Sequence, residues 1–268
     1  MESSVDILKS IPAITITLSE VVSHGESMFE IGQKSEVGFT YEDLIRIYQS
    51  LPEGVCELVN IKDILPKTLY EIPDAYILII RGQFREKADN LLKIMMNSEH
   101  SLDREITGVN WDSTRIVKDR IVENKLFQKL LFLDVGQNYK VPFNPVEKRG
   151  TVYNATKIKD LYEFTLLMSS VLLTSFYIEG TNYYNTTECY KPMSQDKKRK
   201  KLVNLHLGTS FPINFRWFHN TQAVSDLKSL IINHGDVYIM TDITLGSVKD
   251  SVTKLYLKHS LGYNQKSV

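Results

Sequence analysis

The chain has 268 residues, of which 43% are apolar and 24% are charged, and its 32 Lys and Arg residues balance 32 Asp and Glu residues. The length corresponds to one large domain or two small ones. The apolar content is enough for a packed core, which excludes disordered, collagen-like and low-complexity proteins. A formal net charge of zero also counts against a histone-like protein that binds nucleic acid by charge alone.

Cysteine content and the N-terminal sequence indicate an intracellular protein. Cys56 and Cys189 are too few for the disulfide framework of a small secreted protein or for a cysteine-rich zinc site. The first six residues carry acidic side chains where a signal peptide has basic ones. The longest apolar stretch, residues 164–178, contains several Ser and Thr and is shorter than the roughly 20 residues that a membrane span requires. We therefore expect a non-secreted protein without membrane attachment.

Residues 1–150 alternate between helical and strand patterns. Residues 40–48 begin with Thr40, a favourable helix N-cap, and continue with helical spacing. Residues 75–80 form a short apolar run typical of a buried strand, and residues 84–96 return to helical spacing. Strands are indicated near residues 116–122, whereas residues 126–133 fit either period.

The second half begins with its strongest helical pattern, at residues 158–173, and then changes to short strand-like runs. These runs are residues 175–178, 202–207, 213–218, 237–240 and 253–259, at spacings typical of a β-sandwich or barrel. We therefore predict an α+β protein with a helix-rich N-terminal part, residues 1–150, packed on a C-terminal part, residues 151–268. The C-terminal part would contain a bracing helix and a β-barrel. One integrated domain is the alternative.

Five sequence elements follow one another in a recognisable order in the C-terminal part. They are Asn182-x-Tyr184, Ser194-x-Asp196 after nine intervening residues, Leu207-Gly208, Gly235-Asp236 leading to Met240, and His259. In this order they resemble the AlkB-like branch of the iron(II)/2-oxoglutarate dioxygenases, and most closely the oxygenase-like proteins of large DNA viruses and phages. The resemblance is clearest over residues 175–262. It implies a double-stranded β-helix, which is a jelly-roll-like barrel, for this part of the chain.

The resemblance also implies a metal site, with one position altered. These dioxygenases hold iron(II) with two imidazoles and one carboxylate, leaving open positions for 2-oxoglutarate and oxygen. Asp196 matches the carboxylate and His259 the distal imidazole, but Ser194 stands where the first imidazole is expected. A neutral hydroxyl is a poor replacement for an imidazole as an iron(II) ligand.

The implied cosubstrate site departs from the family pattern as well. Asn182 and Tyr184 match the residues that hydrogen-bond 2-oxoglutarate in the family, whose distal carboxylate pairs with an Arg near the C-terminus. No Arg follows His259, and Lys258 directly precedes it. Lysine supplies a positive charge but not the two-pronged fork of a guanidinium.

These departures lead to the hypothesis of a catalytically degenerate dioxygenase-fold protein. It would bind no cofactor and would act as a binding or structural component of a virus, in the host-cell cytoplasm or the virion, with an unidentified protein partner or viral assembly. The alternative is an active dioxygenase that uses iron(II) and 2-oxoglutarate on a nucleic-acid base or a protein side chain, with water or His206 at the missing position. Simpler roles also remain open, with Asp196 as a surface carboxylate and His259 as a barrel histidine bonded to a backbone carbonyl.

A dense basic run offers a further alternative. It comprises Lys197, Lys198, Arg199, Lys200 and Lys201. Such a run is typical of a nucleic-acid patch, which Trp217 and Phe218 could extend by stacking on bases. It is also typical of a charged strand edge that prevents pairing with another sheet, and this is the interpretation that we favour.

Overall fold

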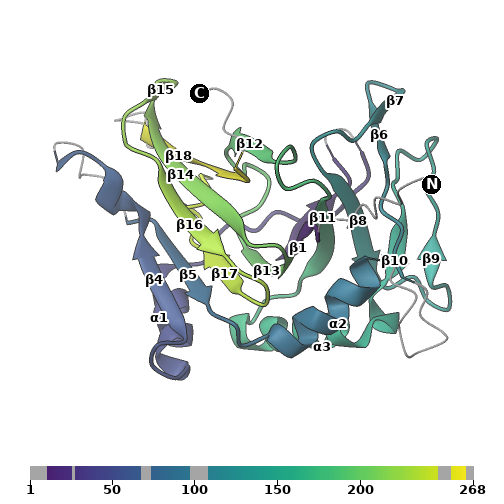
Figure 1. The fold of residues 1–268 in the computed structure, drawn as a ribbon, viewed down its shortest axis with the longest axis horizontal. Coiled ribbons are helices and arrows are strands. Elements are labelled where there is room, and N and C mark those ends of the chain that lie inside the picture. Colours follow the sequence, from purple (N-terminus) through teal and green to yellow (C-terminus); the bar gives the residue numbers. More distant parts are fainter. Residues whose placement is uncertain (1–10, 26–27, 68–73, 97–107, 247–254, 264–268) are drawn as a thin grey trace, which may run out of the picture.

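The computed structural model describes residues 11–25, 28–67, 74–96, 108–246 and 255–263. Within these ranges the protein is an α+β structure, in which a large sheet and a smaller sheet face one another and three α-helices pack outside them (Figure 1). No helix in the described ranges is both long and apolar enough to cross a membrane.

The large sheet combines strands from distant parts of the sequence. Its described strands lie in the order β4 (Cys56–Asn60), β5 (Tyr76–Ile80), β17 (Val237–Met240), β13 (Leu202–Gly208), β1 (Ala13–Ser19), β11 (Tyr177–Tyr183), β8 (Gln128–Leu133), β10 (Val152–Asn154) and β9 (Lys140–Val141). Strands from before and after residue 150 are therefore interleaved in one sheet.

Strand β1 occupies the middle of this sheet and pairs antiparallel along both edges. Thr15 lies opposite Thr181 of β11 on one side and His206 of β13 on the other. All seven residues of β1 are buried, as expected for a strand covered on both faces. Its apolar residues at positions 14, 16 and 18 join the helix-side core, and Thr15 and Thr17 point to the opposite face, toward the small sheet.

The small sheet packs on that second face. Its described strands are β12 (Lys191–Ser194), β18 (Leu255–Leu261) and β14 (Phe211–His219), with β15 (Gln222–Ala223) and β16 (Lys228–Ile232) both paired to β14. Ile77 and Met240 of the large sheet share an apolar core with Phe215, Trp217 and Leu257 of the small sheet. Two hairpins, β2 (Val21–Ser23) with β3 (Glu30–Gly32) and β6 (Thr114–Val117) with β7 (Arg120–Glu123), complete the described strands.

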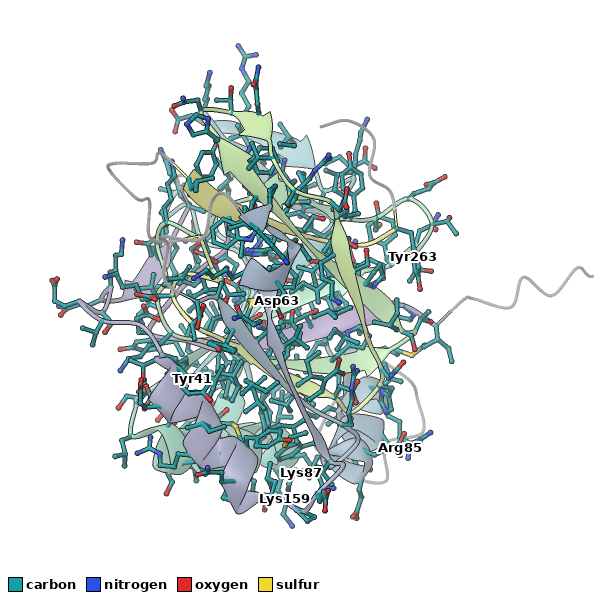
Figure 2. All side chains as sticks on the ribbon, turned by 90° about the vertical axis from the view of Figure 1, so that its left-hand side faces the viewer. Tyr41, Asp63, Arg85, Lys87, Lys159 and Tyr263 are labelled. Carbon is teal, nitrogen blue, oxygen red and sulfur yellow. The ribbon has the colours of Figure 1, made fainter. Side chains whose placement is uncertain are left out.

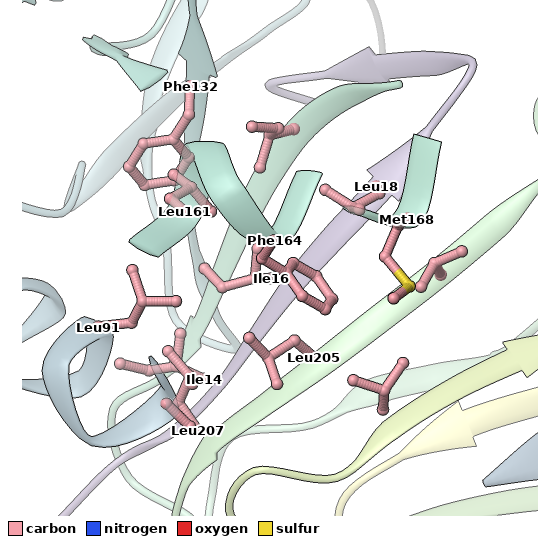
Figure 3. Packing of buried hydrophobic residues seen from close by; sticks show 14 of the residues in the cluster. Ile14, Ile16, Leu18, Leu91, Phe132, Leu161, Phe164, Met168, Leu205 and Leu207 are labelled. Atoms are coloured by element: carbon pink, nitrogen blue, oxygen red, sulfur yellow. The ribbon is translucent and has the colours of Figure 1, made fainter. Parts of the chain in front are cut away.

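Helices cover the other face of the large sheet. The helices are α1 (Tyr41–Ser50), α2 (Arg85–Met95) and α3 (Lys159–Leu172), with short 3₁₀ turns η1 (Ile61–Ile64) and η3 (Ala155–Lys157). Leu91 of α2 and Phe164 of α3 belong to the same buried cluster as Ile16 of β1 (Figure 3). Lys87 of α2, at the lower edge of Figure 2, forms ion pairs with acidic residues of α3 and ties the two helices together.

The structure confirms part of the expected secondary structure. The helix expected at residues 158–173 is α3, and the strands expected at 202–207 and 237–240 are β13 and β17. The strand expected at 175–178 is the start of β11, which continues to Tyr183. The strand expected at 253–259 is β18 from Leu255 onward, and residues 253 and 254 lie outside the described residues.

The expected helix-rich N-terminal part is wrong. In the described part of residues 1–150, helices α1 and α2 are outnumbered by strands β1–β9. Residues 13–19 alternate apolar side chains with Thr and Ser, which is the period-two pattern of a strand, and they form β1. Residues 128–133, which fit either period, form β8 because they pair with both β11 and β10.

Because β1 joins the two halves of the large sheet, truncating its buried side chains should destabilise the whole protein. We expect Ile16→Ala, at a fully buried position, to lower the free energy of unfolding by about 2–5 kcal/mol. The same substitution at Ile121, which is 59% exposed in β7, should cost less than about 0.5 kcal/mol. Urea unfolding followed by circular dichroism measures both values. Equal losses in the two variants would contradict the central role of β1.

Candidate functional site

The structure brings together the three residues that the resemblance assigned to the metal site. Ser194 of β12 lies directly opposite His259 of β18 in the antiparallel ladder. Asp196 follows two residues later, and its backbone N–H donates to the carbonyl of Leu245. Asp196 and His259 are both buried, and each affects the pKa of the other. The expectation that Asp196 could be a surface carboxylate is therefore wrong.

The carboxylate of Asp196 is paired with a guanidinium. Nε of Arg199 donates to Oδ2 of Asp196 at 2.8 Å, and Nη2 forms an ion pair with the same oxygen at 2.6 Å. Burial alone would raise the pKa of Asp196, but the charges of Arg199 and Lys191 hold it well below its usual range. Asp196 is therefore ionised at neutral pH and already neutralised by a fixed cation.

Arg199 also contacts a second buried carboxylate, which belongs to the large sheet. Its Nη1 donates to Oε1 of Glu179 in β11 at 3.0 Å, and Nζ of Lys129 in β8 donates to the same oxygen at 2.9 Å. Burial opposes ionisation of Glu179, but these two cations lower its pKa to about 2. Arg199 thus connects the large sheet to the segment that follows β12 of the small sheet.

His259 faces a lysine. Its Nε2 lies 3.4 Å from Nζ of Lys191 in β12, and its Nδ1 has no hydrogen-bond partner among the described residues. Burial, together with the charge of Lys191, lowers the pKa of His259 to about 3, so the imidazole is neutral at physiological pH. Burial also lowers the pKa of Lys191 to about 8. His259 has no backbone carbonyl as a partner in the described structure, contrary to the simpler expectation.

These side chains form what we call the buried charge cluster: Lys129, Lys191 and Arg199 with Glu179 and Asp196. Three cations and two anions leave one excess positive charge in the interior. Among the described residues, no group of three His, Cys, Asp or Glu side chains is placed to hold a metal ion. The atoms that would bind iron(II), an oxygen of Asp196 and a nitrogen of His259, instead face Arg199 and Lys191. The residues present therefore do not fit an iron(II) site.

Two cavities adjoin the buried charge cluster. The inner cavity, of about 100 Å³, lies between the sheets and is lined by Thr15, Asn204 and His259. The outer cavity, of about 700 Å³, is lined by residues of the β2–β3 and β6–β7 hairpins and of the segment around β12. The linings of the two cavities share five residues, namely Phe127, Lys129, Glu179, Lys191 and Arg199. These five residues therefore stand at the boundary between the two cavities.

The structure does not bring the expected cosubstrate residues into either cavity. Asn182 shares a face of β11 with Ile178, which packs in the helix-side core, and it bonds to Gln128 of β8. The hydroxyl of Tyr184 donates to the backbone carbonyls of residues 124 and 125 at the surface. Asn182 and Tyr184 are therefore not placed to hold a cosubstrate in the cavities, contrary to the expectation. Successive strand residues point to opposite faces, and the β11 residues that face the inner cavity are Glu179, Thr181 and Tyr183.

Lys258 and His206 are also placed away from the cavities. Lys258 precedes the inward-facing His259 and therefore points outward, where its ammonium lies 4.3 Å from the ring centroid of Phe218. His206 is buried in β13, with its Nε2 2.7 Å from the carbonyl of Thr209. Burial lowers the pKa of His206 to about 4. Lys258 is therefore not placed to hold a cosubstrate in the cavities, and His206 does not replace the missing ligand.

The basic run does not present one continuous exposed face. Arg199 points into the interior, and Lys198 pairs with Glu30 at the surface. The backbone N–H groups of Lys200 and Lys201 donate to the carboxylate of Glu20. Much of this run therefore anchors the segment between β12 and β13, whereas the sequence indicated an exposed basic surface.

Several site residues were missed in the sequence. Lys129, Glu179 and Lys191 belong to no motif, and only the strand pairing brings them together. Thr15 could have been found, because the alternation over residues 13–19 predicts a strand with one polar face. For Arg199, no local signal distinguishes an inward-pointing cation from its neighbours in the basic run.

Comparison with known proteins links the chain to a virus. No family model matches the sequence. The chain is 27% identical over 256 residues to an uncharacterized protein of Acanthamoeba polyphaga mimivirus, and the alignment covers 93% of this chain and 95% of that protein. The description of that relative states no activity, so it supports a viral origin and leaves the function to be inferred from the site.

Removal of Arg199 should be far more costly than removal of its neighbour. Arg199→Gln leaves two buried carboxylates without their shared guanidinium, and we expect a loss of about 3–5 kcal/mol in the free energy of unfolding. Lys198→Gln breaks an ion pair in which both side chains are largely exposed and should cost less than about 1 kcal/mol. Urea unfolding of the two variants tests this, and a similar small loss in both would show that the buried pairing is not stabilising.

The depressed pKa of Glu179 predicts acid sensitivity. Its folded pKa, about 2, lies below the ordinary value of 4.5, so the ionised form stabilises the fold above about pH 4.5 and this contribution is lost as the pH falls toward 2. Glu179→Gln should therefore flatten the fall in melting temperature between pH 5 and pH 3. Glu53→Gln, which changes an exposed carboxylate, should keep the wild-type slope. An unchanged slope in Glu179→Gln would contradict the prediction.

Proposed function

We propose that this protein is a non-catalytic member of the dioxygenase-like jelly-roll proteins and serves a virus by binding rather than by oxidation. One observation carries the proposal: the two side chains that match the iron ligands, Asp196 and His259, face the fixed cations Arg199 and Lys191. A guanidinium and an ammonium supply positive charge, but they offer no coordination position for oxygen or a cosubstrate.

The strand order supports the jelly-roll part of this proposal. From β11 to β18 the chain passes between the two sheets, with β11, β13 and β17 in the large sheet and β12, β14, β16 and β18 in the small sheet. An eight-stranded jelly roll needs one more strand in the large sheet. A strand following β18 would return between β11 and β13, and β1 lies at this place. We infer that the N-terminal strand completes the barrel.

This arrangement accounts for the lack of an anchoring arginine. The resemblance places that Arg on a strand after the distal histidine, and β1 takes the position of this strand. The β1 residues that face the inner cavity are Thr15 and Thr17, which carry hydroxyls and no charge. With Lys258 outside the barrel and the guanidinium of Arg199 paired with Asp196 and Glu179, the described lining of the inner cavity offers no unpaired guanidinium of the kind that the family uses for 2-oxoglutarate.

The similarity to a mimivirus protein supports a role in a large DNA virus. In this proposal the protein acts in the host-cell cytoplasm or in the virion, with a partner that its cavity or its surface recognises. The alternative function is an active dioxygenase that acts on a nucleic-acid base or a protein side chain. The two functions differ in whether iron binds and whether 2-oxoglutarate is consumed.

An iron titration under anaerobic conditions tests the proposal. We expect substoichiometric iron(II) binding and no succinate when 2-oxoglutarate and oxygen are then added, because Asp196 and His259 are occupied by Arg199 and Lys191. One equivalent of bound iron, with succinate formation that Asp196→Ala and His259→Ala each abolish, would establish the active dioxygenase instead.

Two engineered variants sharpen this test. Ser194→His restores the expected third ligand but keeps both cations, so it should gain little iron binding. Ser194→His combined with Lys191→Met also frees the imidazole of His259 and should bind iron(II) more tightly than the single variant. Tight iron binding by Ser194→His alone would show that the cations do not block the site.

A further inference from the structure

The inner cavity is lined by buried polar side chains. Oγ1 of Thr15, Nδ2 of Asn204 and Nδ1 of His259 are buried, and each lacks a hydrogen-bond partner among the described residues. All three residues line the inner cavity. Most buried polar groups in proteins are hydrogen-bonded, so three unpartnered groups around one cavity indicate a site built for a polar ligand.

The charge of the buried cluster indicates that this ligand is an anion. Lys129, Lys191 and Arg199 exceed Glu179 and Asp196 by one positive charge in the interior. The nitrogens of Arg199 are directed to the two carboxylates, and Lys129 is paired with Glu179. The ammonium of Lys191, in contrast, contacts the neutral imidazole of His259. The ammonium of Lys191, which lines both cavities, is therefore the cation that remains for a bound anion.

The lining of the outer cavity also carries an excess of positive charge. Seven cationic and three anionic side chains line it, although the whole chain has no net charge. The cations that it adds to the buried charge cluster are Arg115, Lys118, Lys197 and Lys198. A volume of about 700 Å³ lies within the range of small-molecule sites. The two cavities together thus fit a small anionic head group joined to a larger organic body.

The available donors favour phosphate over carboxylate. Recognition of a carboxylate typically uses the bidentate fork of an arginine, and the fork of Arg199 is already paired with Asp196. The groups that remain are a lysine ammonium, a hydroxyl and an amide N–H, which approach the inner cavity from β12, β1 and β13. Donors from several directions suit a tetrahedral oxyanion, and lysine binds phosphate as a point charge.

We propose that the two cavities form a binding site for a phosphate monoester, with the phosphate in the inner cavity against Lys191, Thr15 and Asn204 and the organic body in the outer cavity. This inference rests on the proposed function in that it treats the cavity as a binding site rather than an oxidising one. It goes further by naming the class of ligand and the residues that hold it.

Isothermal titration calorimetry on the full chain tests the site. The probes are inorganic phosphate, adenosine monophosphate as a phosphate monoester, and succinate as a dicarboxylate, at matched ionic strength. We expect the monoester to bind at least about tenfold more tightly than inorganic phosphate, because its body contacts the outer cavity, and succinate to bind more weakly than either. No measurable binding of either phosphate compound, or tighter binding of succinate, would overturn the proposal.

Variants locate the site. Lys191→Met keeps the length of the side chain but removes its charge and should weaken binding of the monoester at least about tenfold. Lys258→Met makes the same change on the opposite face of the small sheet and should leave binding unchanged. Thr15→Val, which is nearly isosteric, should weaken binding severalfold while keeping the fold, which thermal unfolding verifies.

The outcomes separate this inference from the proposed function. Unchanged affinity in both Lys191→Met and Thr15→Val would place the phosphate elsewhere and refute the site, even where iron and succinate assays remain negative. Iron binding with succinate formation would refute the proposed function whether or not phosphate binds. The binding measurements and the iron measurements can therefore refute the two proposals independently of one another.

Discussion

The guanidinium of Arg199 is the group on which the space between the two sheets depends. It joins Glu179 of the large sheet to Asp196 beside the small sheet, and burial of each charge is tolerated because the others are present. Where Phe215, Trp217 and Leu257 fill the space, the sheets are joined by an apolar core. Where Arg199 lies, they are joined by charges, and cavities remain between them. The site thus exists where hydrophobic packing gives way to paired charges.

A positive charge held by side chains differs in chemistry from one held by a metal. Arg199 and Lys191 are covalently part of the chain, so they cannot leave the site; the guanidinium presents its donors in a rigid fork, and the ammonium acts as a compact point charge. They attract anions and stabilise neighbouring carboxylates, but they neither change oxidation state nor exchange ligands. In the proposed function the barrel therefore keeps electrostatic recognition and gives up oxygen activation.

The sequence predicted the local elements well and the faces of the strands poorly. Helix α3 and strands β13 and β17 follow from periodicity, and the meeting of Ser194, Asp196 and His259 follows from the resemblance. Alternation along β18 alone would have predicted that Lys258 and His259 point to opposite faces of the strand. The inward direction of Arg199 could not be predicted, because it depends on Glu179, which lies twenty residues away along the chain in another sheet.

The central position of β1 has a consequence for biosynthesis. A chain is made from its N-terminus, so β1 leaves the ribosome well before β11 and β13, the strands on which both of its edges depend. Until residue 183 has been synthesised, a strand carrying Ile14, Ile16 and Leu18 can complete neither ladder, and the second ladder stays incomplete until residue 208. Unpaired apolar strands of this kind favour aggregation, and contacts distant in sequence form slowly. Newly made chains should therefore depend on chaperones until the last strands of the sheet arrive.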